Sequence, residues 1–221
     1  MATHLGVHEH DDKLRIPSAQ EIQAGRQARD RFLARAKSID GARLSTADRE
    51  TWVMFVGYLE ADAAMDMCAE ELYAVSPRDN PLTRYGRIAE DQPVSPLEQG
   101  ARLASRYEQV GSAIDGEIAL LRAGATQGLF ANAESIRRVV TQFEAELAKP
   151  DEDWPLTLPA REDHAGWSVE DLSAYRLRLQ RAVHESIRSA LERYASVLRD
   201  ELLPNGRSDA QATLIASSLA R

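Results

Sequence analysis

Disulfide pairs, long apolar runs and an excess of positive charge are all missing from this chain, and each absence excludes a class of protein. The single cysteine, Cys68, cannot form an internal disulfide and is typical of a reducing compartment, so we expect a cytoplasmic protein. No run approaches the roughly 18 apolar residues of a transmembrane helix. Residues 1–12 have no apolar core flanked by basic residues, which predicts the absence of a secretory signal.

The acidic balance of the chain argues against two kinds of partner. Its 27 Lys and Arg against 35 Asp and Glu give a formal net charge of −8, which repels phosphate backbones and anionic lipid surfaces. A hydrophobic content of 43% and a charged content of 28% are typical of a globular protein. We therefore expect a globular chain that binds neither nucleic acid nor membrane.

Residues 95–150 carry the strongest helical pattern, that of a helical hairpin. A capping box at residues 95–98 places Pro96 at the first helical position, and Gly124 with Gly128 ends the helix. A second helix begins at Asn132 and ends before Pro150. Apolar residues recur every three or four positions in both: Leu103, Tyr107, Val110, Ile114, Ile118 and Leu121, then Ile136, Val139, Val140, Phe143 and Leu147.

Two helices of opposite charge precede this hairpin. Ser18 caps the first, which is basic over residues 26–37 and ends at Gly41. Ser45 caps the second, which we expect to run to about Val75 and which has no Lys or Arg over residues 51–77. A short turn joins the two helices, so we predict an antiparallel pair. Exposed ion pairs contribute only about 0 to 1 kcal/mol each, so buried apolar faces must hold the pair together.

The remaining sequence completes an all-α prediction. Residues 76–94 and 150–167 are expected to be irregular, and Trp154 and Trp167 are expected to anchor the second of these segments. A last long helix, capped by Ser168, runs to Pro204. We predict a bundle of about five long helices with a short C-terminal helix, divided into an N-terminal arm (1–17), a helical domain (18–206) and a C-terminal tail (207–221).

The N-terminal arm holds the candidates for a metal site. His8, His10 and Asp11 offer imidazole and carboxylate ligands suited to zinc or nickel, and the two histidines point the same way in an extended segment. Such arms also bind metal adventitiously. The favoured interpretation is a solvated arm that packs through Leu5 and Val7.

Elsewhere the sequence lacks a complete catalytic motif. His184 and Glu185 begin like a zinc-peptidase helix, but Arg188 stands where the second histidine is needed. Cys68 has no histidine nearby and is interpreted as a buried, inert thiol.

Three acids spaced four residues apart and two tryptophans are the candidate ligand-binding residues: Asp62, Asp66, Glu70, Trp154 and Trp167. On one helical stripe the three acids repel each other, which favours a basic neighbour such as Arg29 or Arg35.

A family resemblance covers most of the chain. Residues 2–12, 44–49 and 59–60 resemble the opening of the bacterial domain-of-unknown-function family eight-eight-five. The central hairpin, through residues 102–103, Tyr107, residues 120–124 and Gly128, is similar to the middle stretch of that family, and Tyr175, Leu179 and residues 198–204 are similar to the next segment. The resemblance implies a much longer all-helical protein, similar in fold to zinc-dependent carboxypeptidases and oligopeptidases. Its catalytic helix, with His-Glu-x-x-x-x-His or a close relative, is expected beyond the point where this sequence ends.

The resemblance therefore implies a helical scaffold or binding domain of a metallopeptidase-like hydrolase family, without its own zinc motif. It implies no cofactor in this chain, zinc only where a partner supplies the catalytic half, and a protein partner or a homodimer. Two alternatives stay open. The chain is a complete small enzyme acting on a small molecule or peptide, with the arm and the acids of residues 60–71 near its pocket, or it is one subunit of a split metallohydrolase.

Overall fold

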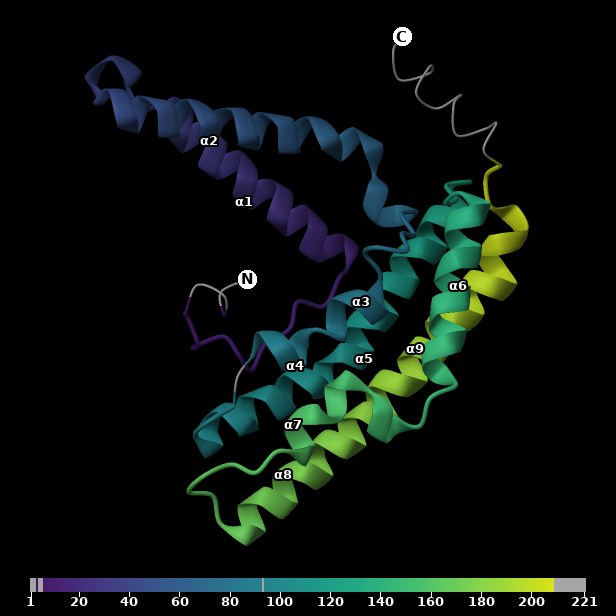
Figure 1. Ribbon diagram of the computed structural model, residues 1–221. Helices are drawn as coiled ribbons and strands as arrows, with labels where there is room; N and C mark the ends of the chain where they lie inside the picture. Colours follow the sequence, from purple (N-terminus) through teal and green to yellow (C-terminus); the bar gives the residue numbers. More distant parts are fainter. Residues whose placement is uncertain (1–2, 4–5, 93, 209–221) are drawn as a thin grey trace.

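The computed structural model describes Thr3, residues 6–92 and residues 94–208, and over these residues the chain is all-α (Figure 1). The one β-type pairing among the described residues is an isolated bridge between Asn132 and Arg207. The expected fold class is confirmed. No helix in the described part of the chain is long and apolar enough to cross a bilayer. The short helix expected in the C-terminal tail falls outside the described residues, and the division into arm, domain and tail stays a prediction.

Helices α1 (Ala19–Lys37) and α2 (Thr46–Met65) form the predicted antiparallel pair, joined through the 3-10 turn η2 (Gly41–Arg43). The pair projects away from the rest of the molecule (Figure 1). Ser18 and Ser45 cap the two helices as predicted, because each hydroxyl accepts a hydrogen bond from the amide three residues on. Only Ala36 and Leu59 are buried within the two helices, so the apolar contact that holds them together is narrow.

Helix α2 ends earlier than predicted, and the expectation that it reaches Val75 is wrong. Two short 3-10 turns, η3 (Asp66–Cys68) and η4 (Glu70–Leu72), follow it. Ala69 between them has a φ of 47°, a left-handed conformation that interrupts a right-handed helix. The break takes Glu70 off the predicted stripe of Asp62 and Asp66, which relieves like-charge repulsion between Asp66 and Glu70. Cys68 is partly exposed rather than buried.

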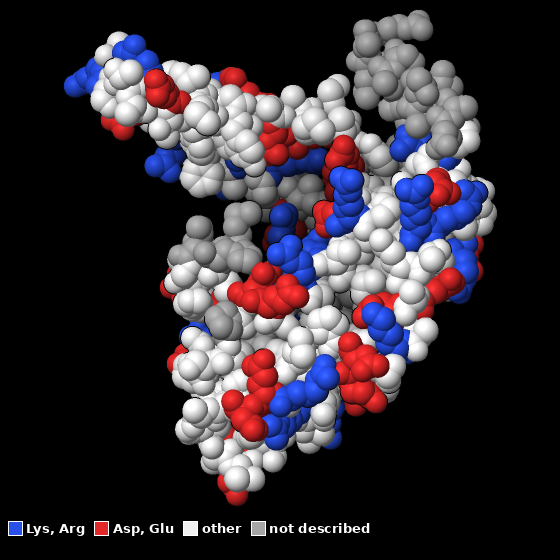
Figure 2. All heavy atoms as spheres, viewed as in Figure 1, with Lys and Arg blue, Asp and Glu red and all other residues white. Residues whose placement is uncertain are grey.

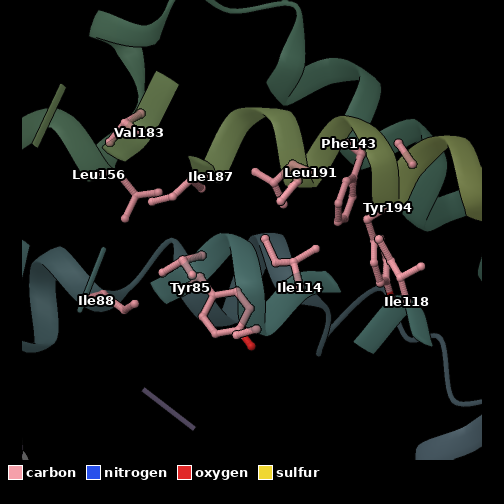
Figure 3. Close-up of a cluster of buried hydrophobic side chains, with 14 of the residues drawn as sticks. Tyr85, Ile88, Ile114, Ile118, Phe143, Leu156, Val183, Ile187, Leu191 and Tyr194 are labelled. Carbon is pink, nitrogen blue, oxygen red and sulfur yellow. The ribbon is translucent and has the colours of Figure 1, made fainter. Parts of the chain in front are cut away.

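The bundle is built from α5 (Leu97–Thr126), α6 (Ala133–Leu147) and a long rod. The rod consists of α8 (Val169–Arg181), the π-helical segment η7 (Ala182–Arg188), α9 (Ser189–Ser196), the π-helical segment η8 (Val197–Leu202) and the 3-10 turn η9 (Leu203–Asn205). Figure 3 shows the core between them, where α5, α6 and α9 contribute Ile114, Ile118, Phe143, Leu191 and Tyr194. The predicted stripes of α5, α6 and the rod therefore face one core.

The ends of the central helices test the capping predictions. The prediction of a capping box at residues 95–98 is wrong, because Pro96 rather than Ser95 is the N-cap of α5. The Ser95 amide donates instead to Gln99 Oε1 at 3.0 Å. The other end is as predicted. Gly128 has a φ of 76°, and the Leu129 amide donates to the Gly124 carbonyl at 2.9 Å, which closes the helix. Asn132 caps α6 as predicted, and Ser168 caps α8.

Short helices occupy the segments that were predicted to be irregular. α3 (Pro81–Tyr85) and α4 (Ile88–Asp91) lie before α5, and Tyr85 and Ile88 pin them to the core. The turns η5 (Asp151–Asp153) and η6 (Pro155–Thr157) and the helix α7 (Leu158–Arg161) lie between α6 and α8. These segments cover the bundle rather than extend it.

Candidate functional site

Asp11, one of the candidate metal ligands, is a buried carboxylate of the N-terminal arm. Thr3 Oγ1 donates to its Oδ1 at 2.6 Å, His8 Nδ1 lies 2.8 Å from its Oδ2, and Arg106 Nη2 of α5 lies 3.5 Å from Oδ1. Burial alone would raise the pKa of Asp11, but the hydrogen bonds and the charge of Arg106 outweigh it and lower the pKa below its usual value. Protein groups already bind both oxygens of this carboxylate.

His8 and His10 do not join Asp11 in a set of converging ligands. Both imidazoles are about half exposed, and His10 lies against Glu9. Their backbone carbonyls accept hydrogen bonds from Arg102 and Arg106, which dock the arm on α5. Among the described residues, no group of three His, Cys, Asp or Glu side chains is placed to hold a metal ion. Val7 is exposed, so the expectation that it packs the arm is wrong, and Leu5 lies outside the described residues.

Asp66 lies at the base of the projecting hairpin and has the basic neighbour that the sequence predicted. Arg29 of α1 binds it with both terminal nitrogens, at 2.9 and 2.6 Å, and Arg26 Nε lies 3.0 Å away. The hydrogen bonds from Arg29 lower the pKa of Asp66 to about 2. Arg26 also binds Glu71, so one network ties α1 to the turns after α2. The other predicted neighbour, Arg35, makes no hydrogen bond or ion pair with Asp62, Asp66 or Glu70, all of which lie within the described residues.

The other two acids have separate environments. Asp62 is half exposed and lies 3.4 Å from Arg29, whereas Glu70 is exposed on η4. The arm and these acids therefore have different basic partners: Arg102 and Arg106 for the arm, Arg26 and Arg29 for the base of the hairpin. The ligand-binding role of the acids stays a prediction.

The two candidate tryptophans hold the segment between α6 and α8 against the bundle. Trp154 is buried, its Nε1 donates to the Glu146 carbonyl at 3.1 Å, and the Arg188 guanidinium lies 5.3 Å from its ring. Trp167 donates to the Ser95 carbonyl at 2.9 Å and stacks on His164 at 4.5 Å. Both are anchors, as expected, and their role in ligand binding stays a prediction.

A groove of about 620 Å³ runs between α5 and the rod, and sequence reasoning missed it. Two bidentate ion pairs cross it, Arg178 with Glu108 and Arg193 with Asp115, at distances between 2.6 and 3.0 Å. The π-helical turn η7 forms one side, where a Cβ on Gly111 would lie 2.4 Å from Ser186 Oγ. Single π-helical turns are frequent at functional sites. The groove carries both signs of charge: these four side chains are paired across it, and Arg181 and Glu185 line it without an ion pair to any described residue.

A second network that the sequence did not reveal lies at the junction of α3 and α5. Glu117 Oε1 accepts hydrogen bonds from the Tyr85 hydroxyl at 2.8 Å and from Arg84 Nη1 at 2.6 Å. Burial raises the pKa of Glu117, and the charge of Arg84 and the bond from Tyr85 only partly offset this. The network fixes α3 on the bundle. No local pattern signals it, since Glu117 is distant in sequence from both partners.

The fold and these networks define an all-α protein in which a helical hairpin projects from a bundle and ion pairs fix the parts in place. The chain belongs to the family described as bacterial protein of unknown function (DUF885), whose model matches residues 1–216. Its fold is similar to the crystal structure of a protein from Colwellia psychrerythraea described as a "putative lipoprotein", with a TM-score of 0.82 and 14% identity. That match covers 93% of this chain but 38% of the other, so this chain spans well under half of that neighbour. No curated protein matches the chain.

Proposed function

We propose that this chain is the helical scaffold and one wall of the substrate cleft of a metallopeptidase-like hydrolase, whose zinc centre lies on a further part of the assembly. One observation carries the proposal: nearly the whole fold recurs as the smaller part of a longer protein, 93% of this chain against 38% of that neighbour. A fold that recurs inside a larger chain is suited to support another part rather than to act alone.

The geometry supports a scaffold because its parts are fixed to each other by buried and paired groups. Arg106 holds the arm, Arg29 holds the base of the hairpin, and Glu117 holds α3, each through hydrogen bonds in which a charged side chain is donor or acceptor. A cleft wall must place its surface within about 0.5 Å of the productive geometry, which rigid helices do better than loops. The bundle is built from helices, which suits it to this role.

The residues described here do not fit a zinc ion themselves. Thr3, His8 and Arg106 already bind the Asp11 carboxylate, and His10 lies against Glu9 instead. Within the described residues no third His, Cys, Asp or Glu side chain joins His8 and Asp11 in a possible metal site. We therefore derive no chemical step through zinc on this chain. In this proposal the metal ligands come from the partner part.

The proposal is tested by native mass spectrometry and metal analysis. This chain is mixed with the region that follows the matched segment in a longer member of the family, expressed separately. We expect a one-to-one complex that contains zinc and cleaves peptides, while this chain alone holds no stoichiometric zinc. Failure to form the complex, or one equivalent of zinc in the chain alone, contradicts the proposal.

The proposal also includes a cytoplasmic location. It allows a homodimer of this chain in place of the complex with the zinc-bearing part. Cell fractionation tests the location, and light scattering across protein concentration tests the dimer. A membrane-bound pool contradicts the cytoplasmic location. A monomer at every concentration contradicts the homodimer.

A further inference from the structure

The side of α2 that faces away from α1 is apolar along most of the helix. Trp52, Leu59 and Asp66 lie on the inner side, where Trp52 Nε1 donates to the Ala36 carbonyl and Asp66 binds Arg29. With about 100° of rotation per residue, the opposite side holds four large apolar residues and the small residues between them. The large residues are all more than half exposed: Val53 (56%), Met54 (75%), Tyr58 (69%) and Met65 (53%). The small ones are Gly57, Ala61 and Ala64.

Such a row needs an explanation. Apolar residues scattered singly over a surface are ordinary, but a contiguous exposed apolar patch is typical of an interaction site. Figure 2 shows this side of the hairpin as a largely uncharged stretch with acidic side chains beside it. Because the hairpin stands away from the bundle, nothing in the described part of the chain covers this row (Figure 1).

Over residues 51–65 of α2, which include the whole row, every charged residue is acidic. Glu60 and Asp62 lie on the two borders of the row, and no Lys or Arg occurs over residues 51–77. Lys37 and Arg29 of α1 approach these acids at 2.6 and 3.4 Å. Both carboxylates nevertheless stay about half exposed, so a second cation can reach each of them.

Methionine is concentrated here as well. Three of the four methionines of the chain, Met54, Met65 and Met67, lie on or beside the row and are exposed. Methionine is unbranched and polarisable, which lets a surface adapt to different apolar partners. An adaptable apolar row bordered by acids is complementary to an amphipathic helix with basic borders.

We propose that this row, Val53, Met54, Tyr58 and Met65 with the border acids Glu60 and Asp62, is a docking surface for one amphipathic helix of a protein partner, whose apolar stripe is bordered by Lys or Arg. The row extends over residues 53–65 of α2, which at about 1.5 Å per residue offers roughly 20 Å for a parallel or antiparallel helix. A second copy of this chain fits less well. Glu60 and Asp62 lie on the borders of the row about halfway along its length, so two copies of the row packed together would place acids beside acids. The proposal does not require the zinc-bearing part proposed above.

The test uses the full chain and two synthetic helical peptides of about 18 residues, long enough for roughly five turns. One carries a leucine stripe bordered by lysine, and the other has glutamate in place of every lysine. Isothermal titration calorimetry should show that the lysine peptide binds at least about tenfold more tightly than the glutamate peptide. The double variant Met54→Asp and Met65→Asp should weaken binding of the lysine peptide by about tenfold or more. Val169→Asp is the matched control, because Val169 is 77% exposed on α8, away from this row, and should leave the affinity unchanged.

A second variant tests the charge itself. Glu60→Lys with Asp62→Lys should reverse the preference, so that the glutamate peptide binds more tightly. Far-ultraviolet circular dichroism confirms that each variant retains its helices. Equal binding of both peptides, or an equal loss in the Val169 variant, overturns the proposal. So does a concentration-dependent dimer that the methionine variant dissociates, because the occupant is then a second copy.

Discussion

The α-carbon of Gly124 in α5 lies directly against the backbone carbonyl of Leu72, so that a Cβ on Gly124 would stand 1.9 Å from that oxygen. Leu72 belongs to η4, the last turn after the projecting hairpin. The close approach of these two backbones fixes the base of the hairpin on the bundle. Only glycine permits it, because any side chain would occupy the position of the carbonyl oxygen.

Gly124→Ala should therefore destabilise the protein. The added methyl group has backbone in its way, and overpacking of this kind costs typically about 1 to 3 kcal/mol. Urea unfolding measures the loss, and hydrogen exchange should show faster exchange in residues 66–72. Gly57→Ala is the matched control, because nothing lies within 4 Å of its Cβ position on α2. That change should stabilise the helix by roughly 0.5 to 1 kcal/mol. Equal stability of the two variants contradicts the prediction.

Trp154→Ala should lower the free energy of unfolding by about 3 to 5 kcal/mol, as for other buried aromatic residues. The indole is buried, lies under the Arg188 guanidinium and binds the Glu146 carbonyl. Trp154→Phe keeps most of the packing and loses the hydrogen bond, so it should cost less, about 1 to 2 kcal/mol. Urea denaturation of both variants measures the difference. A Trp154→Ala protein as stable as the wild type would favour a ligand role for Trp154 over an anchoring one.

Local signals in the sequence predicted the ends of most helices. Ser18, Ser45 and Ser168 succeed because a hydroxyl and an amide three residues on are enough to form the cap. Ser95 fails because Gln99, one position beyond the expected Glu98, takes the same amide. The early end of α2 depends on Arg26 and Arg29, which bind Asp66 and Glu71 from another helix. A pattern within one helix cannot predict these ion pairs, because the arginines belong to a different helix.

The candidate site was less predictable than the fold. The burial of Asp11 depends on Arg106, which lies 95 positions away, and the sequence interpretation accordingly treated Asp11 as an available ligand. The groove beside η7 depends on a π-helical turn. Sequence could not predict this turn, because the four-residue spacing of Val183 and Ile187 fits a regular α-helix equally well. The candidate site is formed by contacts between residues that are far apart in the sequence, and composition and local patterns do not reveal such contacts.

Asp66→Asn should remove a pH-dependent part of the stability of the hairpin. Because Arg29 lowers the pKa of Asp66 to about 2, the native state favours the ionised carboxylate. This contribution is present above the usual pKa of 3.8 and is lost as the pH falls towards 2. Wild type should therefore protect the amides of α1 and α2 more than Asp66→Asn at neutral pH, and the difference should vanish near pH 2.

Hydrogen exchange followed by mass spectrometry measures this protection for residues 19–65. Asp62→Asn is the control, because the Asp62 side chain is half exposed and its carboxylate makes one long contact of 3.4 Å with Arg29. Exposed pairs of this kind contribute about 0 to 1 kcal/mol, so the control should change protection little at neutral pH. A constant difference between wild type and Asp66→Asn from neutral pH to pH 2 would show that the Arg29 pair does not carry the effect.

Asp11→Asn should destabilise the protein, whereas His10→Ala should not. Asparagine keeps the shape and can still accept the Thr3 hydrogen bond, but it leaves the largely buried Arg106 without its opposing charge. Breaking a buried pair in this way costs up to about 3 to 5 kcal/mol, less here because the contact is 3.5 Å long. His10 is half exposed, and exposed substitutions are usually within about 0.5 kcal/mol.

Adding zinc distinguishes a structural role of Asp11 from a role as a metal ligand. A metal bound only by the native state would raise the melting temperature as its concentration rises. Since Arg106, Thr3 and His8 already bind the carboxylate, zinc should leave the melting temperature of wild type unchanged. A zinc-dependent rise that is abolished by both His8→Ala and His10→Ala would instead assign the arm to metal binding, and the loss in Asp11→Asn would then be loss of a ligand.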